Sequence, residues 1–303
     1  MNHLQNVIFQ DETKVRDWLE ACLWPHGVVC PHCGTVGAAT ALQGDAHRAG
    51  VYQCNETACR EQFTVTVGTV FERSKIPLTK WLMVVFLMAA SKKGMSAHQI
   101  HRMIGVSYKS TWFMCHRIRE AMKSGNNGLL GGGSGIVEAD ETFTGTKEGA
   151  TKKRGWGHKN AVFSLVERGG DVRSFHVPNV TAKTLKPILL AQVSAQAKVY
   201  TDDFRAYKKA KLARDLDQHQ TVNHSAKEYV RGTIHTNTIE GYFSLLKRGI
   251  IGTYHHVGSQ HLQRYCTEFD FRYNGRKLSD VERADQLLKG VAGKRLVYRS
   301  LDS

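Results

Sequence analysis

Two pairs of cysteines constrain the first part of this chain more tightly than any other feature of its sequence. The four residues are Cys30, Cys33, Cys54 and Cys59. A Cys-x-x-Cys turn can present both sulfurs to one tetrahedral ion, and two pairs separated by about twenty residues are typical of a four-thiolate zinc ribbon. Segments 50–54 and 62–67 alternate as short strands would. The sequence therefore predicts a structural zinc site, because four thiolates leave no coordination position open for catalysis.

Other interpretations of the cysteines explain less. A redox motif needs a single Cys-x-x-Cys pair and would not account for the second pair. The remaining cysteines have no partner at ligand spacing and are expected in the core; they are Cys22, Cys115 and Cys266. Disulfides are not expected, because a reducing, cytoplasmic setting fits this usage better.

The charge of the chain indicates a polyanionic partner. Lysine and arginine number 42 against 27 aspartates and glutamates, which gives a formal net charge of +15. Such a surface favours nucleic acid, because each neutralised phosphate releases counterions. A membrane is not expected: the longest apolar run, residues 81–90, is about half of a bilayer span, and residues 1–5 do not resemble a signal peptide.

The composition changes several times along the chain and predicts five parts. These are a zinc ribbon with an N-terminal helix (1–75), a helical domain (76–124), a glycine-rich linker (125–135), an α/β domain (136–285) and a C-terminal tail (286–303).

The helical domain has the pattern of a helix-turn-helix. Thr79 is expected to cap a first helix, a short helix should begin after Ser96, and a longer one should begin after Ser107. The exposed face of the longer helix would offer DNA a set of polar and basic residues, namely Lys109, Ser110, His116, Arg117 and Arg119. The alternative is an αα-hairpin that only packs, because Trp112, Phe113 and Ile118 describe a core stripe.

The sequence of the α/β domain predicts the element order of an RNase H-like fold. Three strands, a helix, a strand, a helix, a strand and a final helix follow one another. The corresponding segments are 135–145, 160–166, 171–177, 181–193, 198–203, 204–210, 220–223 and 237–248. We expect a mixed sheet with flanking helices.

Three acids on these elements are the candidate catalytic residues: Asp140, Asp202 and Glu240. In an RNase H-like arrangement they would converge at one edge of the sheet. Clustered carboxylates repel one another unless cations neutralise them, so the site implies Mg²⁺ or Mn²⁺. Two such ions could activate the attacking oxygen and stabilise the leaving oxygen of a phosphodiester.

Neighbouring residues add contacts to this site and leave alternatives open. Lys247 lies about two helical turns after Glu240 on the same face and, with Arg248, could contact phosphate. Asn237 lies about one turn before Glu240 on that face. Strand alternation places Asp140 and its competitor Glu138 on one face, and the other competitor, Glu141, on the opposite face. Asp203 competes with Asp202 but can be explained as an N-cap. The loop that contains Lys152, Lys153, Arg154 and Trp156 is a weaker candidate for a phosphate contact.

Several stretches together resemble one family. They are residues 138–142, 200–202, 235–240, 244–250, 252–256 and 269–274. The chain is similar over nearly its whole length to bacterial insertion-sequence transposases of the zinc-ribbon DDE type. The resemblance implies cleavage and strand transfer on terminal inverted repeats and target DNA, a nucleoid-associated location, and a homodimer or larger assembly that holds two DNA ends. Some relatives use asparagine as the third catalytic residue, so Asn237 competes with Glu240; the spacing to Lys247 favours Glu240.

Other functions remain open at this point. An RNase H-like nuclease or resolvase would hydrolyse DNA without joining strands. A zinc-ribbon regulator would bind DNA without chemistry, but it has no use for three acids on converging elements. An inactive, decayed copy is a further alternative.

Overall fold

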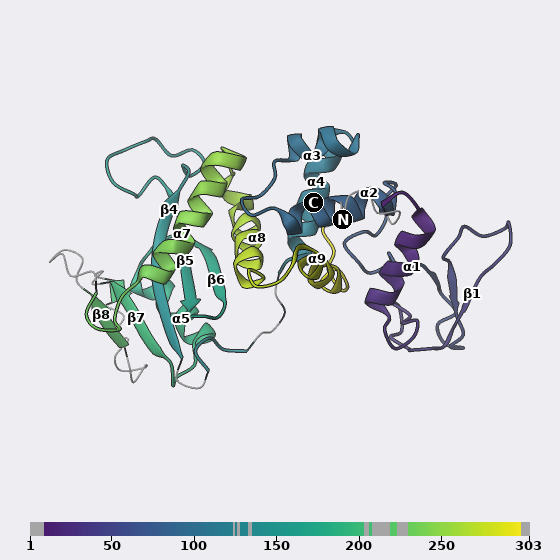
Figure 1. Ribbon diagram of the computed structural model, residues 1–303, viewed down its shortest axis with the longest axis horizontal. Coiled ribbons are helices and arrows are strands. Elements are labelled where there is room, and N and C mark those ends of the chain that lie inside the picture. Colours follow the sequence, from purple (N-terminus) through teal and green to yellow (C-terminus); the bar gives the residue numbers. More distant parts are fainter. Residues whose placement is uncertain are drawn as a thin grey trace. The chain divides into compact units, whose positions relative to one another are not determined.

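The computed structural model describes residues 9–123, 125, 128–132, 135–202, 206–207, 219–222 and 230–297. The chain forms two compact units (Figure 1). The first contains Met1–Lys123 together with Leu278–Ser303, and the second contains Ser124–Lys277. Among the described residues, no helix is long and apolar enough to cross a membrane.

The first unit begins with a helix and a small antiparallel sheet. Helix α1 (Glu12–Leu23) is capped by the carboxylate of Asp11, which accepts hydrogen bonds from the backbone N–H groups of Thr13 and Lys14 at 2.9 and 3.2 Å. The sheet has the order β1-β2-β3, with β1 at Ala39–Ala41, β2 at Tyr52–Cys54 and β3 at Gln62–Phe63. Both segments predicted to be strands therefore contain one, although each strand is shorter than the predicted segment.

The helical part of this unit is assembled around α2 (Leu78–Ala90), most of whose side chains are buried. The prediction that Thr79 caps this helix is wrong. Helix α2 begins at Leu78, two residues earlier than a Thr79 cap would give, and its N-terminal N–H groups are bound by Glu12 of α1, which accepts from Leu78 N at 2.8 Å and Thr79 N at 3.2 Å. The cap is thus supplied by a distant residue, which local sequence cannot indicate.

Two further helices follow with the predicted caps. Helix α3 (Ala97–Ile104) is capped by Ser96, and α4 (Tyr108–Ala121) is capped by Ser107. Gly105 ends α3 in the left-handed region at φ 63°, where glycine is favoured. The helices pack on each other and on α2.

The C-terminal helix belongs to this unit as well. Helix α9 (Asp280–Lys289) packs against α1 and α2, and Thr69 forms a β-bridge with Ala292. The α/β domain was predicted to extend to residue 285, which lies inside α9. The structure assigns the whole helix to the first unit because its apolar face, with Leu287 and Leu288, is buried there.

The second unit is built on a five-stranded mixed sheet of order β6-β5-β4-β7-β8 (Figure 1). The strands are β4 (Ile136–Thr144), β5 (Asn160–Glu167), β6 (Val172–Val177), β7 (Lys198–Asp202) and β8 (His219–Val222). The first three form an antiparallel meander, and β7 and β8 run parallel to β4.

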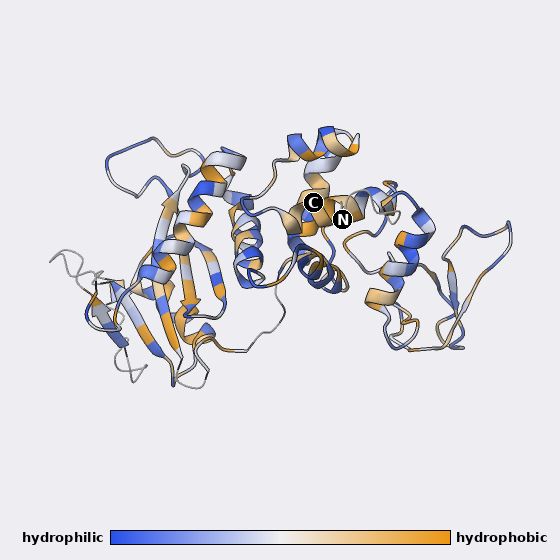
Figure 2. Cartoon of the chain, viewed as in Figure 1, coloured by the Kyte–Doolittle hydropathy of each residue, from blue (hydrophilic) through white to orange (hydrophobic). Residues whose placement is uncertain are grey.

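Helices cover both faces of this sheet. Helix α5 (Ala182–Gln192) packs on the face formed by Ala161, Phe163 and Leu165 of β5. Helices α7 (Asn237–Gly249) and α8 (Leu262–Asn274) pack on the face formed by Val162 and Val166, and the short turns η5 (Ile250–Tyr254) and η6 (Ser259–His261) connect them. Figure 2 shows hydrophobic residues gathered along the strands and on part of α7. Alternate residues of one strand therefore enter two cores, and the predicted fold class is confirmed.

The predicted linker is partly built into this unit. Leu130 is 2% exposed and forms a parallel bridge with Val193. A Cβ atom at Gly131, where φ is 73°, would lie 2.4 Å from Ala197 Cβ. Glycine is required there by close packing, so this part of the segment is not a free spacer. Other predicted positions, including the cap residue Asp203 and most of the helix at 204–210, lie outside the described residues.

Candidate catalytic and metal sites

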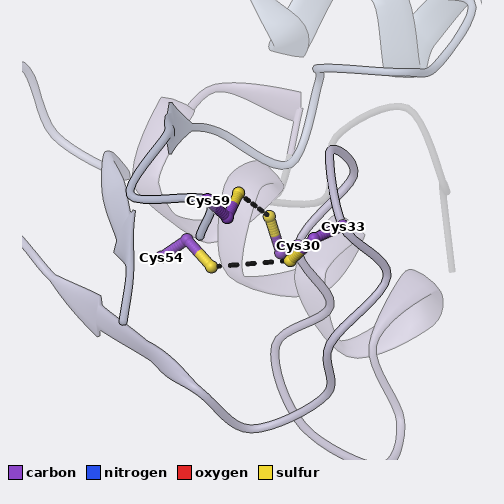
Figure 3. Close-up of side chains that lie close together, drawn as sticks. All are labelled: Cys30, Cys33, Cys54 and Cys59. Carbon is purple, nitrogen blue, oxygen red and sulfur yellow. Dashed lines mark hydrogen bonds between the residues drawn. The ribbon is translucent and has the colours of Figure 1, made fainter. Parts of the chain in front are cut away.

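The four cysteine sulfurs gather at one point in the first unit (Figure 3). Cys30 and Cys33 lie in a turn before β1, Cys54 ends β2, and Cys59 lies in the turn that follows. Cys30 Sγ is 3.8 Å from Cys59 Sγ, Cys33 Sγ is 3.6 Å from Cys54 Sγ, and all four sulfurs lie within 4.8 Å of one another. Zn–S bonds of about 2.3 Å in a tetrahedron place the sulfurs about 3.8 Å apart. The geometry therefore fits a four-thiolate zinc site.

The turn that carries Cys30 and Cys33 is held by backbone hydrogen bonds. Gly34 N donates to Cys30 O at 2.8 Å, and Gly34 adopts φ 79°. Aromatic side chains pack beneath the ribbon: Trp24 lies 5.4 Å from Tyr52 and 6.0 Å from Phe63 between ring centroids. The described core beside the cysteines is small, with Phe63 buried against Cys30 and Cys54, so a bound zinc ion would add to its stability.

In the second unit, three strand and helix positions bring acids together. Asp140 lies in the middle of β4, and Asp202 ends β7 one position beyond the paired residues Ala139 and Thr201. Glu240 lies in the first turn of α7. The pKa of Asp140 is raised well above its ordinary value, first by burial and then by the negative charges of Glu141, Asp202 and Glu240. The three predicted acids thus lie close enough for their charges to influence Asp140.

The carboxylates are more widely spaced than the thiolates. Within the described part of the chain, the cysteine cluster is the one group of potential metal ligands whose atoms all lie within 4.8 Å of one another. The oxygens of the carboxylates are the ligands that Mg²⁺ and Mn²⁺ prefer, and their mutual repulsion is the condition that a cation relieves. The donor chemistry therefore fits divalent ions held between the carboxylates.

Glu141 lies beside this group but has a different partner. The hydroxyl of Tyr207, a fully buried residue, donates to Glu141 Oε2 at 2.7 Å. Burial raises the pKa of Glu141 to about 7, against the lowering effect of this hydrogen bond. The sequence offered no signal for Tyr207, because the pair forms between segments that are distant along the chain.

Glu138 is excluded as a free metal ligand by its contacts. Its side chain is completely buried, and Arg168 Nε donates to its Oε1 at 2.5 Å. The same carboxylate accepts from Thr238 Oγ1 at 2.9 Å and from Ile239 N at 3.0 Å. Arg168 also donates to the carbonyl oxygens of Thr233 and His235. Glu138 therefore attaches the N-terminus of α7 to β4, two residues from Asp140.

Helix α7 presents the other predicted site residues. Asn237 is its first residue and is exposed, and Glu240 accepts from Thr236 Oγ1 at 3.1 Å. Lys247 and Arg248 are exposed in its last turn. Asn237, Glu240 and Lys247 are all exposed, as expected for residues on one helix face.

The predicted DNA-contacting face of α4 needs a correction. Lys109 is exposed and Ser110 is half-buried, but Arg117 and Arg119 are only 7% and 2% exposed, and His116 is buried. Arg117 Nη2 donates to Glu72 O at 2.7 Å, and its guanidinium lies 5.3 Å from the ring of Trp81. The predicted contacts by His116, Arg117 and Arg119 are wrong because this half of α4 faces the core of the first unit.

The comparisons with known proteins follow the same division of the chain. Residues 133–274 match the model of the ISXO2-like transposase domain, and residues 10–62 match that of the transposase zinc-ribbon domain. A protein of the transposable element ISH50 of Halobacterium salinarum is 30% identical over 283 residues, which are 87% of this chain and 91% of the relative. The chain belongs to the ISXO2-like transposase family.

A second relative matches a shorter stretch of this ISXO2-like family member. It is a transposase-like protein of Haemophilus influenzae, 30% identical over 115 residues, which are 38% of this chain and 90% of the relative. Asp140, Asp202 and Glu240 all lie within the ISXO2-like transposase domain, and the four cysteines lie within the zinc-ribbon domain. The family resemblance predicted from the sequence motifs is confirmed.

Proposed function

We propose that this chain cleaves DNA at the terminal inverted repeats of an insertion sequence and joins the ends to target DNA. The observation that carries the proposal is the convergence of Asp140, Asp202 and Glu240 inside a transposase-family domain. Three acids from two parallel strands and a helix lie close enough there for the negative charges of Glu141, Asp202 and Glu240 to raise the pKa of Asp140. Such a cluster calls for cations from solution.

The three carboxylates would hold Mg²⁺ or Mn²⁺. When bound, two such ions would activate an attacking oxygen and stabilise the leaving oxygen of the phosphodiester. The work of the chain is positioning: β4 and β7 hold Asp140 and Asp202 side by side, and Glu138 fixes the helix that carries Glu240. Lys247 and Arg248 on the same helix would contact phosphates next to the scissile bond.

Glu240 is favoured over Asn237 as the third residue. Its negative charge is one of those that raise the pKa of Asp140, and Thr236 orients its carboxylate. Asn237 lies at the exposed start of α7 and could instead donate to DNA.

The first unit would hold DNA. Its four-cysteine ribbon would contain structural zinc, and the N-terminal turn of α4, with the exposed Lys109 and the half-buried Ser110, would contact the repeat. The assembly would be a dimer or larger, because strand transfer requires two DNA ends to be held together. Gel filtration with and without end DNA tests this: a monomer in both conditions contradicts it.

The function is tested by cleavage and joining of a labelled inverted-repeat end in Mg²⁺. We expect Asp140→Asn, Asp202→Asn and Glu240→Gln to lose both activities while retaining DNA binding, and Asn237→Ala to retain part of both. An inactive Asn237→Ala with an active Glu240→Gln would instead make asparagine the third residue. Cleavage without joining in the unmodified protein would indicate a nuclease, and binding without metal-dependent chemistry would indicate a regulator.

A further inference from the structure

The loop between β4 and β5, residues 145–159, carries the most exposed aromatic side chain among the described residues of the second unit. Trp156 is 58% exposed, although a side chain of this size and polarity is usually covered. Its place in the loop is determined by contacts at the base. Lys147 N donates to His158 O and Lys159 N donates to Trp156 O, both at 2.9 Å, and Lys147 Nζ donates to Pro178 O at 3.2 Å.

The ring itself is held in a defined plane. Phe143, near the end of β4, stacks on Trp156 with ring centroids 5.5 Å apart and planes 14° apart. Lys159 Nζ lies 4.6 Å from the centroid of the Trp156 ring. More than half of the indole surface nevertheless stays open to solvent, so a further flat group can extend the stack.

The rest of the loop is basic. Lys152, Lys153 and Arg154 are exposed, and none of the three forms an ion pair with a carboxylate in the described part of the chain. Figure 2 shows this loop, at the upper left of the view, as mostly hydrophilic. An exposed aromatic ring beside cations with no acidic partner is the combination by which proteins bind unpaired nucleotides: the ring stacks on a base while the cations contact phosphates.

The loop rises from the sheet edge at which the acids converge. Strand β7 ends at Asp202, level with Asp140, whereas β4 continues to Thr144. Phe143 lies three residues beyond Asp140, roughly 10 Å at the rise of a strand. That length corresponds to about three base steps of DNA. Because Asp140 and Phe143 point to opposite faces of β4, this is the shortest separation, and a strand whose phosphate lies between the acids would pass around the end of β4 to reach Trp156.

We propose that Trp156 stacks on an unpaired base of the DNA held at the carboxylate site, within a few nucleotides of the scissile phosphate, and that Lys152, Lys153 and Arg154 contact the adjoining phosphates. This proposal rests on the proposed function, because it takes the polymer at the acids to be DNA.

The test uses inverted-repeat ends in which 2-aminopurine replaces one unpaired base at a time near the cleavage site. Binding is measured with the Asp140→Asn protein in Mg²⁺, so that cleavage does not interfere. We expect the fluorescence of one or two adjacent positions to change on binding. Trp156→Ala should abolish this change and weaken binding roughly 5- to 100-fold, Trp156→Phe should keep most of it, and Leu190→Ala, a similarly exposed residue of α5, should leave it intact.

Two further measurements complete the test. Replacing Lys152, Lys153 and Arg154 by glutamine should lower the salt dependence of binding by about one unit for each phosphate that the loop no longer neutralises. Fully paired ends should bind the Trp156→Ala variant as well as they bind its parent. An unchanged 2-aminopurine signal in Trp156→Ala overturns the stacking proposal; if the unmodified protein still cleaves and joins ends, the proposed function stands without it. Failure of the unmodified protein to bind end DNA overturns both.

Discussion

At the scale of single residues, three carboxylates of the second unit, one buried and two half-buried, are accommodated in different ways. Glu138 is paired with Arg168 and helix N–H groups. Asp270 lies among hydroxyl groups, which it binds at 2.6 to 2.8 Å: Tyr242 OH, Ser174 Oγ and also Ser174 N. Asp140 is surrounded by other acids. Glu138 is a structural link, burial outweighs the hydrogen bonds of Asp270 and favours its protonated form, and Asp140 is suited to a cation.

The surroundings of Asp270 predict a dependence of stability on pH. Burial raises its pKa to about 7, from 3.8 in an unstructured chain. Between these two values the folded state binds more protons than the unfolded state, so the free energy of unfolding should fall as the pH rises through this window, by on the order of 4 kcal/mol in full. Asp270→Asn should flatten this slope in urea unfolding measured at several pH values. A slope that is the same in Asp270→Asn and its parent contradicts the assignment.

The cysteine site predicts the metal content of the chain. The protein should contain one zinc ion per chain, and Cys54→Ser should lose it, because Cys54 is fully buried and its sulfur lies 3.6 Å from that of Cys33. Zinc is counted with a chromogenic chelator after denaturation. Cys22→Ser is the matched control, since Cys22 lies outside the cluster and should leave the zinc content unchanged. Full zinc in Cys54→Ser would rule out the four-thiolate site.

At the scale of secondary-structure elements, the position of α7 relative to β4 decides whether the acids meet. The Glu138 carboxylate lies at the N-terminus of α7, where a negative charge also interacts favourably with the helix dipole. Neither partner of this link is a candidate metal ligand. The position of Glu240 relative to Asp140 therefore depends on the contact between Glu138 and the N-terminus of α7, which involves neither of these two acids.

The link predicts a distinct effect of substitution at Glu138. Glu138→Ala leaves Arg168 without its buried partner and should lower the free energy of unfolding by about 3 to 5 kcal/mol. Glu138→Gln can still accept from Ile239 N, so it should cost less and should raise the Mg²⁺ concentration needed for half-maximal cleavage. Urea unfolding and a Mg²⁺ titration of cleavage measure the two effects. If Glu138→Gln loses cleavage at every Mg²⁺ concentration while it stays folded, Glu138 has a direct catalytic role instead.

At the scale of the whole molecule, the two units are not consecutive in the sequence. The chain forms the first unit, builds the second from Ser124 to Lys277, and returns to the first with α9. Described residues after Lys277 therefore contribute to the core of the first unit: Leu287 and Leu288 are 0% and 1% exposed.

Removal of residues 278–303 should consequently destabilise the first unit, although most of that unit comes from the start of the sequence. Without α9, the apolar face of α2 is exposed, and the segment 76–123 should be cleaved by protease at least about tenfold faster, because cleavage follows the population of the open form. The second unit should keep its protection. Limited proteolysis followed by mass spectrometry locates the cuts; faster cleavage confined to β4–β8 would show that the C-terminal helix supports the second unit.

The sequence by itself determined the features that depend on spacing along the backbone. Cysteines in two close pairs predicted the ribbon, alternating strands and their order predicted the α/β fold, and acids on three named elements predicted the residues that meet. The caps of α3 and α4 were equally readable, because a serine and the N–H group that it binds are three residues apart.

The tertiary structure alone decided which side chains are covered and which distant groups meet. Helical periodicity cannot distinguish an arginine that faces solvent from one that packs on Trp81, so Arg117 was placed on the wrong side. The cap of α2 by Glu12, the Tyr207–Glu141 hydrogen bond and the position of α9 each join segments far apart in the chain. Burial and pairing depend on such neighbours, which a single sequence does not reveal, whereas spacing is a property of the backbone itself.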